Sequence, residues 1–129
     1  MSHEFHLRVY YEDTDLAGIV YYANYLKFIE RARTEFVASI GVDQKALKAQ
    51  QGIVFAVRRV EADYLKPALF QDDLTVWTRV QQLTGARIVL DQVVSRADEM
   101  LFSAVVTLVA LTAEGKPARL PANIRRIVK

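Results

Sequence analysis

The segment YYEDTDLAGIVYYANYLKFIERARTEF, residues Tyr10–Phe36, decides the fold of this chain. A turn rich in carboxylates, from Glu12 to Gly18, ends the extended pattern that precedes it, and glycine can give such a turn a positive φ. After the turn, apolar residues recur at spacings of three and four, which is typical of an amphipathic helix: Tyr22, Tyr25, Leu26, Ile29, Ala32 and Phe36. We therefore expect a long helix over Ile19–Ile40, with Asn24 as a candidate cap.

Segments with a period of two residues lie on both sides of this helix. We expect a first strand over Phe5–Tyr11 and, after a short helix over Val42–Gln51 that Asp43 caps, four further strands. The four strands are expected after Gly52, from Leu74, over Arg87–Ser95 and over Met100–Leu111, with turns between them and a basic tail at Lys116–Lys129. In the first of the four, Val54, Ala56, Val60, Ala62 and Tyr64 are expected on one face. The strand over Met100–Leu111 is apolar on both faces, so it should be central and buried on both sides, one side by a subunit contact.

This order of elements indicates an α+β protein. The fold expected is a curved, five-stranded antiparallel sheet that wraps around one long central helix. With 129 residues the chain is long enough for one domain with a real core and too short for two ordinary ones, so we expect a single domain over residues 1–129.

The composition excludes several classes of protein. Hydrophobic residues make up 52% of the chain and the net charge is +2, so the surface is too mixed to indicate a nucleic-acid partner. The absence of cysteine excludes disulfides and thiolate metal sites, and fits a cytoplasmic protein. We find neither the apolar region of a signal peptide nor an apolar run long enough to span a membrane. Motifs for metal ligation, a serine nucleophile or nucleotide binding are also absent.

The carboxylates of the turn remain as the candidate chemical site. An isolated acid in a turn is most often a cap or an Asx-turn residue. The alternative is that Asp15 acts on a carbonyl, either as a general base for water or as a nucleophile. The N-terminus of the following helix would supply a backbone N–H to the developing oxyanion, and its dipole favours an ionised carboxylate.

The motif Y-Y-E-D-T-D-x-A-G-I-V-Y-Y-A-N-Y, followed by E-R-A-R-T-E, resembles the hot-dog acyl-CoA thioesterases. The similar branches are the small bacterial thioesterases associated with the Tol–Pal system and the 4-hydroxybenzoyl-CoA thioesterases. The resemblance implies a hot-dog fold and a homodimer or homotetramer with sites at the interface. It also implies hydrolysis of acyl-CoA, most simply a short-chain aliphatic acyl-CoA, without a metal or organic cofactor.

The resemblance also implies roles for particular residues. Asp15 corresponds to the family's catalytic carboxylate, and the N–H of Tyr22 to the donor that polarises the thioester carbonyl. Phe55, Ala56 and Val57 correspond to a segment that lies along the pantetheine arm. Phosphate contacts vary in the family, so Arg58, Arg59 and Lys66 are only candidates. Tol–Pal-associated members often carry histidine where this chain has Tyr22, and tyrosine at this position is closer to the 4-hydroxybenzoyl-CoA branch.

Alternative functions stay open from the sequence. An aromatic thioesterase acting on 4-hydroxybenzoyl-CoA keeps the same chemistry. A hot-dog dehydratase or hydratase normally uses a histidine, which neither the turn nor the long helix contains. A module that binds acyl-CoA or acyl-carrier protein without catalysis, or a scaffold in the cell envelope, would show saturable binding and no hydrolysis.

Overall fold

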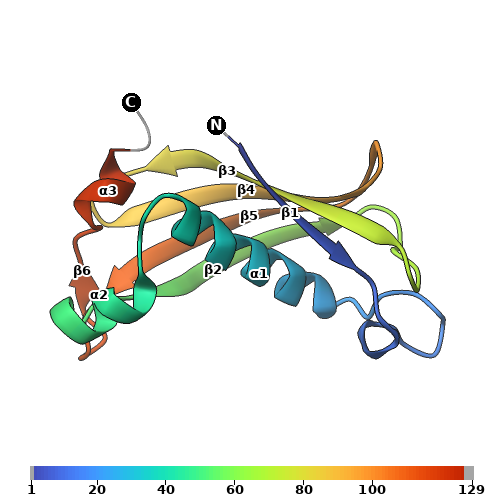
Figure 1. Cartoon of the computed structure of the whole chain (residues 1–129), viewed down its shortest axis with the longest axis horizontal. Helices are drawn as coiled ribbons and strands as arrows, with labels where there is room; N and C mark the ends of the chain where they lie inside the picture. The colour runs from blue at the N-terminus through green and yellow to red at the C-terminus, as the bar shows by residue number, and fades with distance from the viewer. Residues whose placement is uncertain (1, 127–129) are drawn as a thin grey trace.

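The computed structural model describes residues 2–126. Six strands form one sheet, and α1 lies across one face of it (Figure 1). The strands are β1 (Ser2–Arg8), β2 (Val54–Tyr64), β3 (Asp73–Leu83), β4 (Arg87–Arg96), β5 (Glu99–Leu111) and β6 (Pro117–Ala118). The helices are α1 (Asn24–Ser39), α2 (Gln44–Gln51) and α3 (Ala122–Arg125), with a single 3₁₀ turn η1 at Tyr11–Asp13. The expected α+β architecture is confirmed.

The sheet is antiparallel throughout, with the order β1-β3-β4-β5-β2, and β6 pairs with β5. The five strands expected from the sequence are therefore all present. The short β6 and α3 were not expected: both form within the segment predicted to be a basic tail. The last residues of that segment, 127–129, lie outside the described part of the chain. Asp43 caps α2 as expected, since its Oδ1 accepts the N–H of Ala46 at 3.0 Å.

The core lies between α1 and the inner face of the sheet. Of the predicted apolar stripe of the helix, Tyr25, Ile29, Ala32 and Phe36 are buried against the sheet. Burying each large apolar side chain contributes about 1.5–3 kcal/mol to folding, so this interface holds the helix in place. Two members of the stripe were predicted wrongly: Tyr22 and Leu26 are 61% and 41% exposed, and Tyr22 lies before the helix, which begins at Asn24.

A buried polar contact also ties α1 to the sheet. Gln92 of β4 is fully buried, and its Nε2 donates to the carbonyl of Ile29 at 3.0 Å and to Oγ1 of Thr78 at 2.9 Å. Its Oε1 accepts from Nη1 of Arg33 at 3.0 Å. Both the oxygen and the nitrogen of the Gln92 amide are hydrogen-bonded. Since a buried polar group without a partner is costly, moving α1 away from β3 and β4 would carry a free-energy penalty, and Gln92 thus fixes the position of the helix.

The first strand and the long helix both have shorter bounds than the sequence predicts. β1 ends at Arg8, and Tyr11, expected as the last residue of this strand, lies in the 3₁₀ turn. The helix begins at Asn24, not Ile19, because Ile19 and Val20 are extended and pair with Leu69 and Thr14. The bridge from Ile19 to Leu69 joins segments that are distant in the sequence, and such a contact cannot be predicted from local periodicity.

β2 carries a bulge that changes which side chains share a face. Its pairing with β5 shifts between Val57 and Arg59, and one extra residue in a strand reverses the alternation beyond it. Val60, Ala62 and Tyr64 therefore share the inner face with Phe55 and Val57. Ala56 and Val54, which were predicted to lie with Val60, turn to the outer face, so that prediction was wrong.

β5 is a central strand, as predicted, but it is not buried on both faces in the single chain. Its even-numbered residues from Phe102 to Ala110 are buried in the core, whereas its odd-numbered residues from Ser103 to Leu111 are only half-buried. The outer face lacks a covering layer among the described residues, so the proposed subunit contact stays a prediction.

Candidate active site

The carboxylate turn is a tight loop closed by backbone hydrogen bonds. The N–H of Asp15 donates to the carbonyl of Ile19 at 2.9 Å, and the N–H of Gly18 donates to the carbonyl of Asp15 at 3.0 Å. Gly18 has a φ of 81°, a backbone conformation that residues other than glycine adopt only at a cost in free energy. This loop lies at the end of the molecule opposite α2 and α3 (Figure 1). It therefore presents Asp15 on a fixed backbone at an open edge of the protein.

The Asp15 side chain is exposed and only partly engaged. Its Oδ1 accepts the N–H of Ala17 at 2.9 Å, which is the Asx-turn contact common for aspartate in turns. Within residues 2–126, no hydrogen bond or ion pair engages its Oδ2. One carboxylate oxygen thus orients the group, while the other remains available to a water or a carbonyl carbon.

Asp13, the other aspartate of the D-x-D pair, has a structural role. It is buried, with Oδ2 accepting the N–H of Tyr10 at 2.8 Å and Oδ1 accepting from Nδ2 of Asn24 at 2.9 Å. Its carbonyl accepts the N–H of Tyr21 at 2.8 Å. Asp13 therefore fastens the turn to the first residue of α1. Asn24, expected as a cap, instead uses its side chain for this contact, and Ala23 occupies the cap position without a side-chain bond.

The peptide group that carries the Tyr22 N–H is held from its carbonyl side. The carbonyl of Tyr21 belongs to the same peptide unit and accepts the N–H of Asn24 at 2.8 Å. Because the described chain has no cis peptide bonds, the N–H of Tyr22 points in the opposite direction from that carbonyl. No backbone hydrogen bond outside the helices and strands of residues 2–126 uses this N–H as donor. The donor is thus oriented and free to act on a ligand.

A small apolar pocket of about 300 Å³ lies beside Tyr22, lined by Ile19, Val20, Tyr22, Tyr25, Tyr64, Leu65, Lys66 and Pro67. Its wall is the loop between β2 and β3, which is bonded directly to the helix start. The N–H of Val20 donates to the carbonyl of Ala68, and the N–H of Ala68 donates to the hydroxyl of Tyr25, both at 2.9 Å. The pocket is therefore built from the same contacts that hold the turn.

Charged contacts with Arg96 and Glu99 also hold the loop between β2 and β3 in place. Arg96 donates to Oδ2 of Asp72 and to Oε1 of Glu99, each at 2.6 Å, and Lys66 donates to Glu99 at 2.8 Å. The hydrogen bonds from Lys66 and then Arg96 lower the pKa of Glu99, which keeps it ionised. Of the candidate phosphate ligands, Lys66 is thus engaged, and Arg59 pairs with Glu61 at 3.4 Å. Arg58 has no ion pair within the described residues.

The structure does not bring Phe55, Ala56 and Val57 to Asp15 within one chain. They lie at the start of β2, whereas Tyr64, which lies beside Tyr22, is at its end. At about 3.3 Å per residue, the strand separates these two ends by roughly 30 Å. Phe55 and Val57 line a second small pocket with Arg33 of α1, and Ala56 faces away from it.

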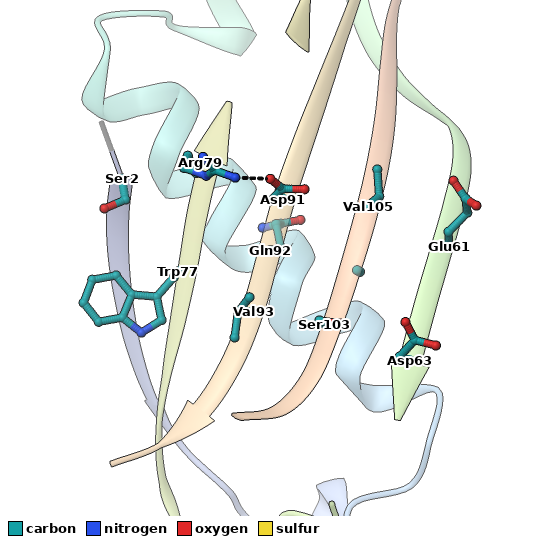
Figure 2. A pocket seen from close by; sticks show the side chains of 11 residues that line it. Ser2, Glu61, Asp63, Trp77, Arg79, Asp91, Gln92, Val93, Ser103 and Val105 are labelled. Atoms are coloured by element: carbon teal, nitrogen blue, oxygen red, sulfur yellow. Dashed lines mark hydrogen bonds and ion pairs between the residues drawn. The ribbon is translucent and has the colours of Figure 1, made fainter. Parts of the chain in front are cut away.

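A larger cavity of about 550 Å³ lies on the outer face of the sheet, away from α1 (Figure 2). Trp77 and Arg79 of β3 bound it on one side and Glu61 and Asp63 of β2 on the other, with residues of β4 and β5 between them, among them Asp91, Val93, Ser103 and Val105. Arg79 donates to Asp91 at 2.6 Å across the strands. Its position on the other face separates this cavity from the Asp15 turn.

Sequence reasoning missed the contacts by which three residues build the site: Asp13, Asn24 and Tyr64. The D-x-D pair contains Asp13, but spacing alone does not tell the structural aspartate from the reactive one. Tyr64 is 42 positions from Tyr22, so only the folded chain shows their contact. No group of three His, Cys, Asp or Glu side chains placed to hold a metal ion occurs among residues 2–126.

Comparisons with known proteins agree with this architecture. The profile of the thioesterase superfamily matches residues 17–103. The chain is 38% identical over 122 residues to the acyl-CoA thioesterase YbgC of Haemophilus influenzae, covering 94% of this chain and 90% of that protein. The solved structure of a probable thioesterase from Bartonella henselae superposes with a TM-score of 0.89 at 39% identity, covering 94% of this chain and 100% of that one.

The fold is shared more widely than the sequence. A 4-hydroxybenzoyl-CoA thioesterase mutant, solved with 4-hydroxybenzoyl-CoA, superposes with a TM-score of 0.90 at 23% identity, covering 96% of each chain. This likeness concerns the fold, and the expected hot-dog fold is confirmed. None of the helices formed by residues 2–126 has the length and hydrophobicity of a membrane-spanning segment.

Proposed function

This chain belongs to the thioesterase superfamily and is an acyl-CoA thioesterase, and we propose that Asp15 and the N–H of Tyr22 carry out its reaction. Water adds to the thioester carbonyl carbon, the carbon–sulfur bond breaks, and the free acid and CoA thiol leave. The observation that supports this assignment is a pair of groups: a carboxylate with one unengaged oxygen on the turn that Asp13 fastens to α1, and an oriented, unused backbone N–H just before that helix.

Asp15 has two routes to this result. As a general base it takes a proton from the attacking water and returns it to the departing thiolate. As a nucleophile it forms an acyl anhydride, which water then hydrolyses. In both routes negative charge develops on the carbonyl oxygen. The N–H of Tyr22 stabilises this charge, and one such donor is typically worth about 3 kcal/mol of barrier.

The pocket beside Tyr22 favours a short aliphatic acyl group. Its lining is mostly apolar, and three of its polar groups are already engaged. The hydroxyls of Tyr25 and Tyr64 bond to backbone groups, and the ammonium of Lys66 bonds to Glu99. A hydroxylated aromatic acyl group would have to pair with the Tyr22 hydroxyl, which has no hydrogen bond among residues 2–126, since an unpaired buried hydroxyl is costly.

The experiment that tests this proposal is release of CoA thiol from a panel of thioesters. The panel contains straight-chain acyl-CoAs of increasing length, 4-hydroxybenzoyl-CoA, and one short acyl group carried on acyl-carrier protein. We expect the highest kcat/KM with a short aliphatic acyl-CoA and a lower value with 4-hydroxybenzoyl-CoA. The reverse ranking would favour the aromatic alternative, and hydrolysis of the carrier-protein thioester alone would identify the carrier as the true substrate.

We further propose that two chains pair through their β2 edges to complete each site. β2 is a long strand at the edge of the sheet and leaves Val57, Val60 and Tyr64 between 38% and 48% exposed. Long apolar edges of this kind are templates for pairing with another strand. In antiparallel self-pairing, the start of each strand lies beside the end of the other. Such a dimer would bring Phe55 and Val57 of one copy toward Tyr64 of the other.

The charges of β2 are self-complementary for this pairing. A two-fold centred on Val60 places Arg59 of each copy opposite Glu61 of the other. We expect Arg59→Glu to weaken dimerisation roughly thirty-fold, because it creates two symmetric like-charge contacts that cost about 1 kcal/mol each. Sedimentation velocity over a concentration series measures the effect.

The double variant Arg59→Glu with Glu61→Arg restores opposite charges and serves as the matched control. It should recover the dimer together with kcat/KM. A wild-type protein that is monomeric at assay concentration and fully active would contradict the shared site.

A further inference from the structure

We propose that Tyr64 is a positioning residue for catalysis, whose hydroxyl fixes the Tyr22 backbone so that its N–H meets the thioester oxygen. This inference rests on the proposed role of the Tyr22 N–H. The hydroxyl of Tyr64 donates to the carbonyl of Tyr22 at 2.9 Å, and this bond links the end of β2 to the segment just before α1.

The bond completes the restraint of Tyr22. The peptide unit before its Cα is held by Asn24, whose N–H donates to the carbonyl of Tyr21. The peptide unit after its Cα is the one that Tyr64 holds through the carbonyl of Tyr22. With both neighbouring peptide planes fixed, φ and ψ of Tyr22 are fixed as well, and so is the direction of its N–H. Without Tyr64, only one of the two planes is held from outside.

Tyr64 is itself rigidly placed. Its ring packs edge-on against Phe102 at 5.0 Å, Tyr25 at 5.5 Å and Tyr22 at 6.1 Å between ring centroids. Phe102 is fully buried and stacks on Tyr25, so the cluster is anchored in the core. Partial burial, with Tyr22 and Tyr25 nearby, raises the pKa of the Tyr64 hydroxyl. The group therefore stays protonated and remains a donor throughout the neutral range.

This arrangement separates a positioning role from a packing role. A preorganised hydrogen-bond donor stabilises charge that develops in the transition state. Loss of its fixed orientation therefore lowers kcat more than it weakens substrate binding. Tyr64→Phe keeps the aromatic ring and its contacts and removes only the hydrogen bond. Small misplacements of a catalytic group cost up to about a hundred-fold in rate.

The test compares Tyr64→Phe with the wild type on a short-chain acyl-CoA. We expect kcat to fall on the order of ten-fold, with KM within about two-fold, because one of two restraints on the donor is lost. Affinity for the matching S-alkyl-CoA thioether, which lacks the carbonyl oxygen, should not change. Tyr11→Phe is the matched control: this tyrosine lies in η1 and is 82% exposed, and the kcat of this variant should equal that of the wild type.

The proposal is overturned if Tyr64→Phe keeps the wild-type kcat. It is also overturned if kcat and thioether affinity fall together with the melting temperature, because that pattern marks a packing defect. Asp15→Asn in the same assay separates this inference from the function it rests on. An inactive Asp15→Asn beside a fully active Tyr64→Phe removes only the positioning role, whereas an active Asp15→Asn removes the catalytic assignment itself.

Discussion

Replacing Asp15 with asparagine is expected to lower kcat for acyl-CoA hydrolysis about a thousand-fold, within the range typical for loss of a general base. Asparagine has nearly the same shape, and its side-chain oxygen can still accept the N–H of Ala17 that shapes the turn. It cannot take a proton from water or attack the carbonyl. Because Asp15 is exposed and has no buried partner, the free energy of unfolding should change by less than about 1 kcal/mol.

Steady-state CoA release and urea unfolding check the two halves of this prediction. Asp98→Asn is the matched control, since Asp98 is an exposed aspartate in the turn between β4 and β5 and does not line the pocket beside Tyr22. It should leave kcat unchanged. An Asp15→Asn protein that unfolds early would show that Asp15 supports the turn and would remove the argument for a chemical role.

Asp13→Ala is expected to act in the opposite way, chiefly on stability. The buried carboxylate satisfies the N–H of Tyr10 and the side-chain amide of Asn24. Removing it leaves both donors without a partner, and each such loss costs about 1–3 kcal/mol. We expect the free energy of unfolding to fall by about 3 kcal/mol, together with kcat, because the turn is no longer fastened to α1.

Urea denaturation of Asp13→Ala and Asp13→Asn gives a graded test. Asparagine keeps one acceptor oxygen of the two, so its free energy of unfolding should lie between those of the wild type and the alanine variant. Equal stability of all three proteins would contradict the structural role of Asp13. A destabilised Asp13→Ala would support separate roles for the two aspartates of the D-x-D pair, a structural role for Asp13 and a catalytic role for Asp15.

Local patterns in the sequence are sufficient to predict the strands and the helices that bury a face. The spacing of Tyr25, Ile29 and Phe36 predicts which side of α1 contacts the sheet, because apolar residues at this spacing form one stripe along the helix, and that stripe is buried. The resemblance to known thioesterases identified Asp15 and Tyr22 as the candidate reactive groups. In the structure Asp15 lies on the turn that precedes α1, and Tyr22 lies just before the first residue of that helix.

Contacts between distant segments could not be predicted in this way. The helix begins later than expected because Ile19 pairs with Leu69 on the loop after β2. The bulge after Val57 changes the face of Ala56, and a strand pattern read with a strict period of two misses it. The bond from Tyr64 to Tyr22 joins two elements whose proximity only the sheet topology creates.

The central claim is that Asp15 performs chemistry and does not serve mainly to bind the substrate. The most direct measurement is made on purified Asp15→Asn and wild-type protein, with acyl-CoA binding and CoA release followed on the same samples. The account predicts that Asp15→Asn binds the short-chain acyl-CoA with an affinity close to that of the wild type for the thioether analogue, while CoA release falls about a thousand-fold. Release near the wild-type rate from a folded Asp15→Asn protein would contradict it.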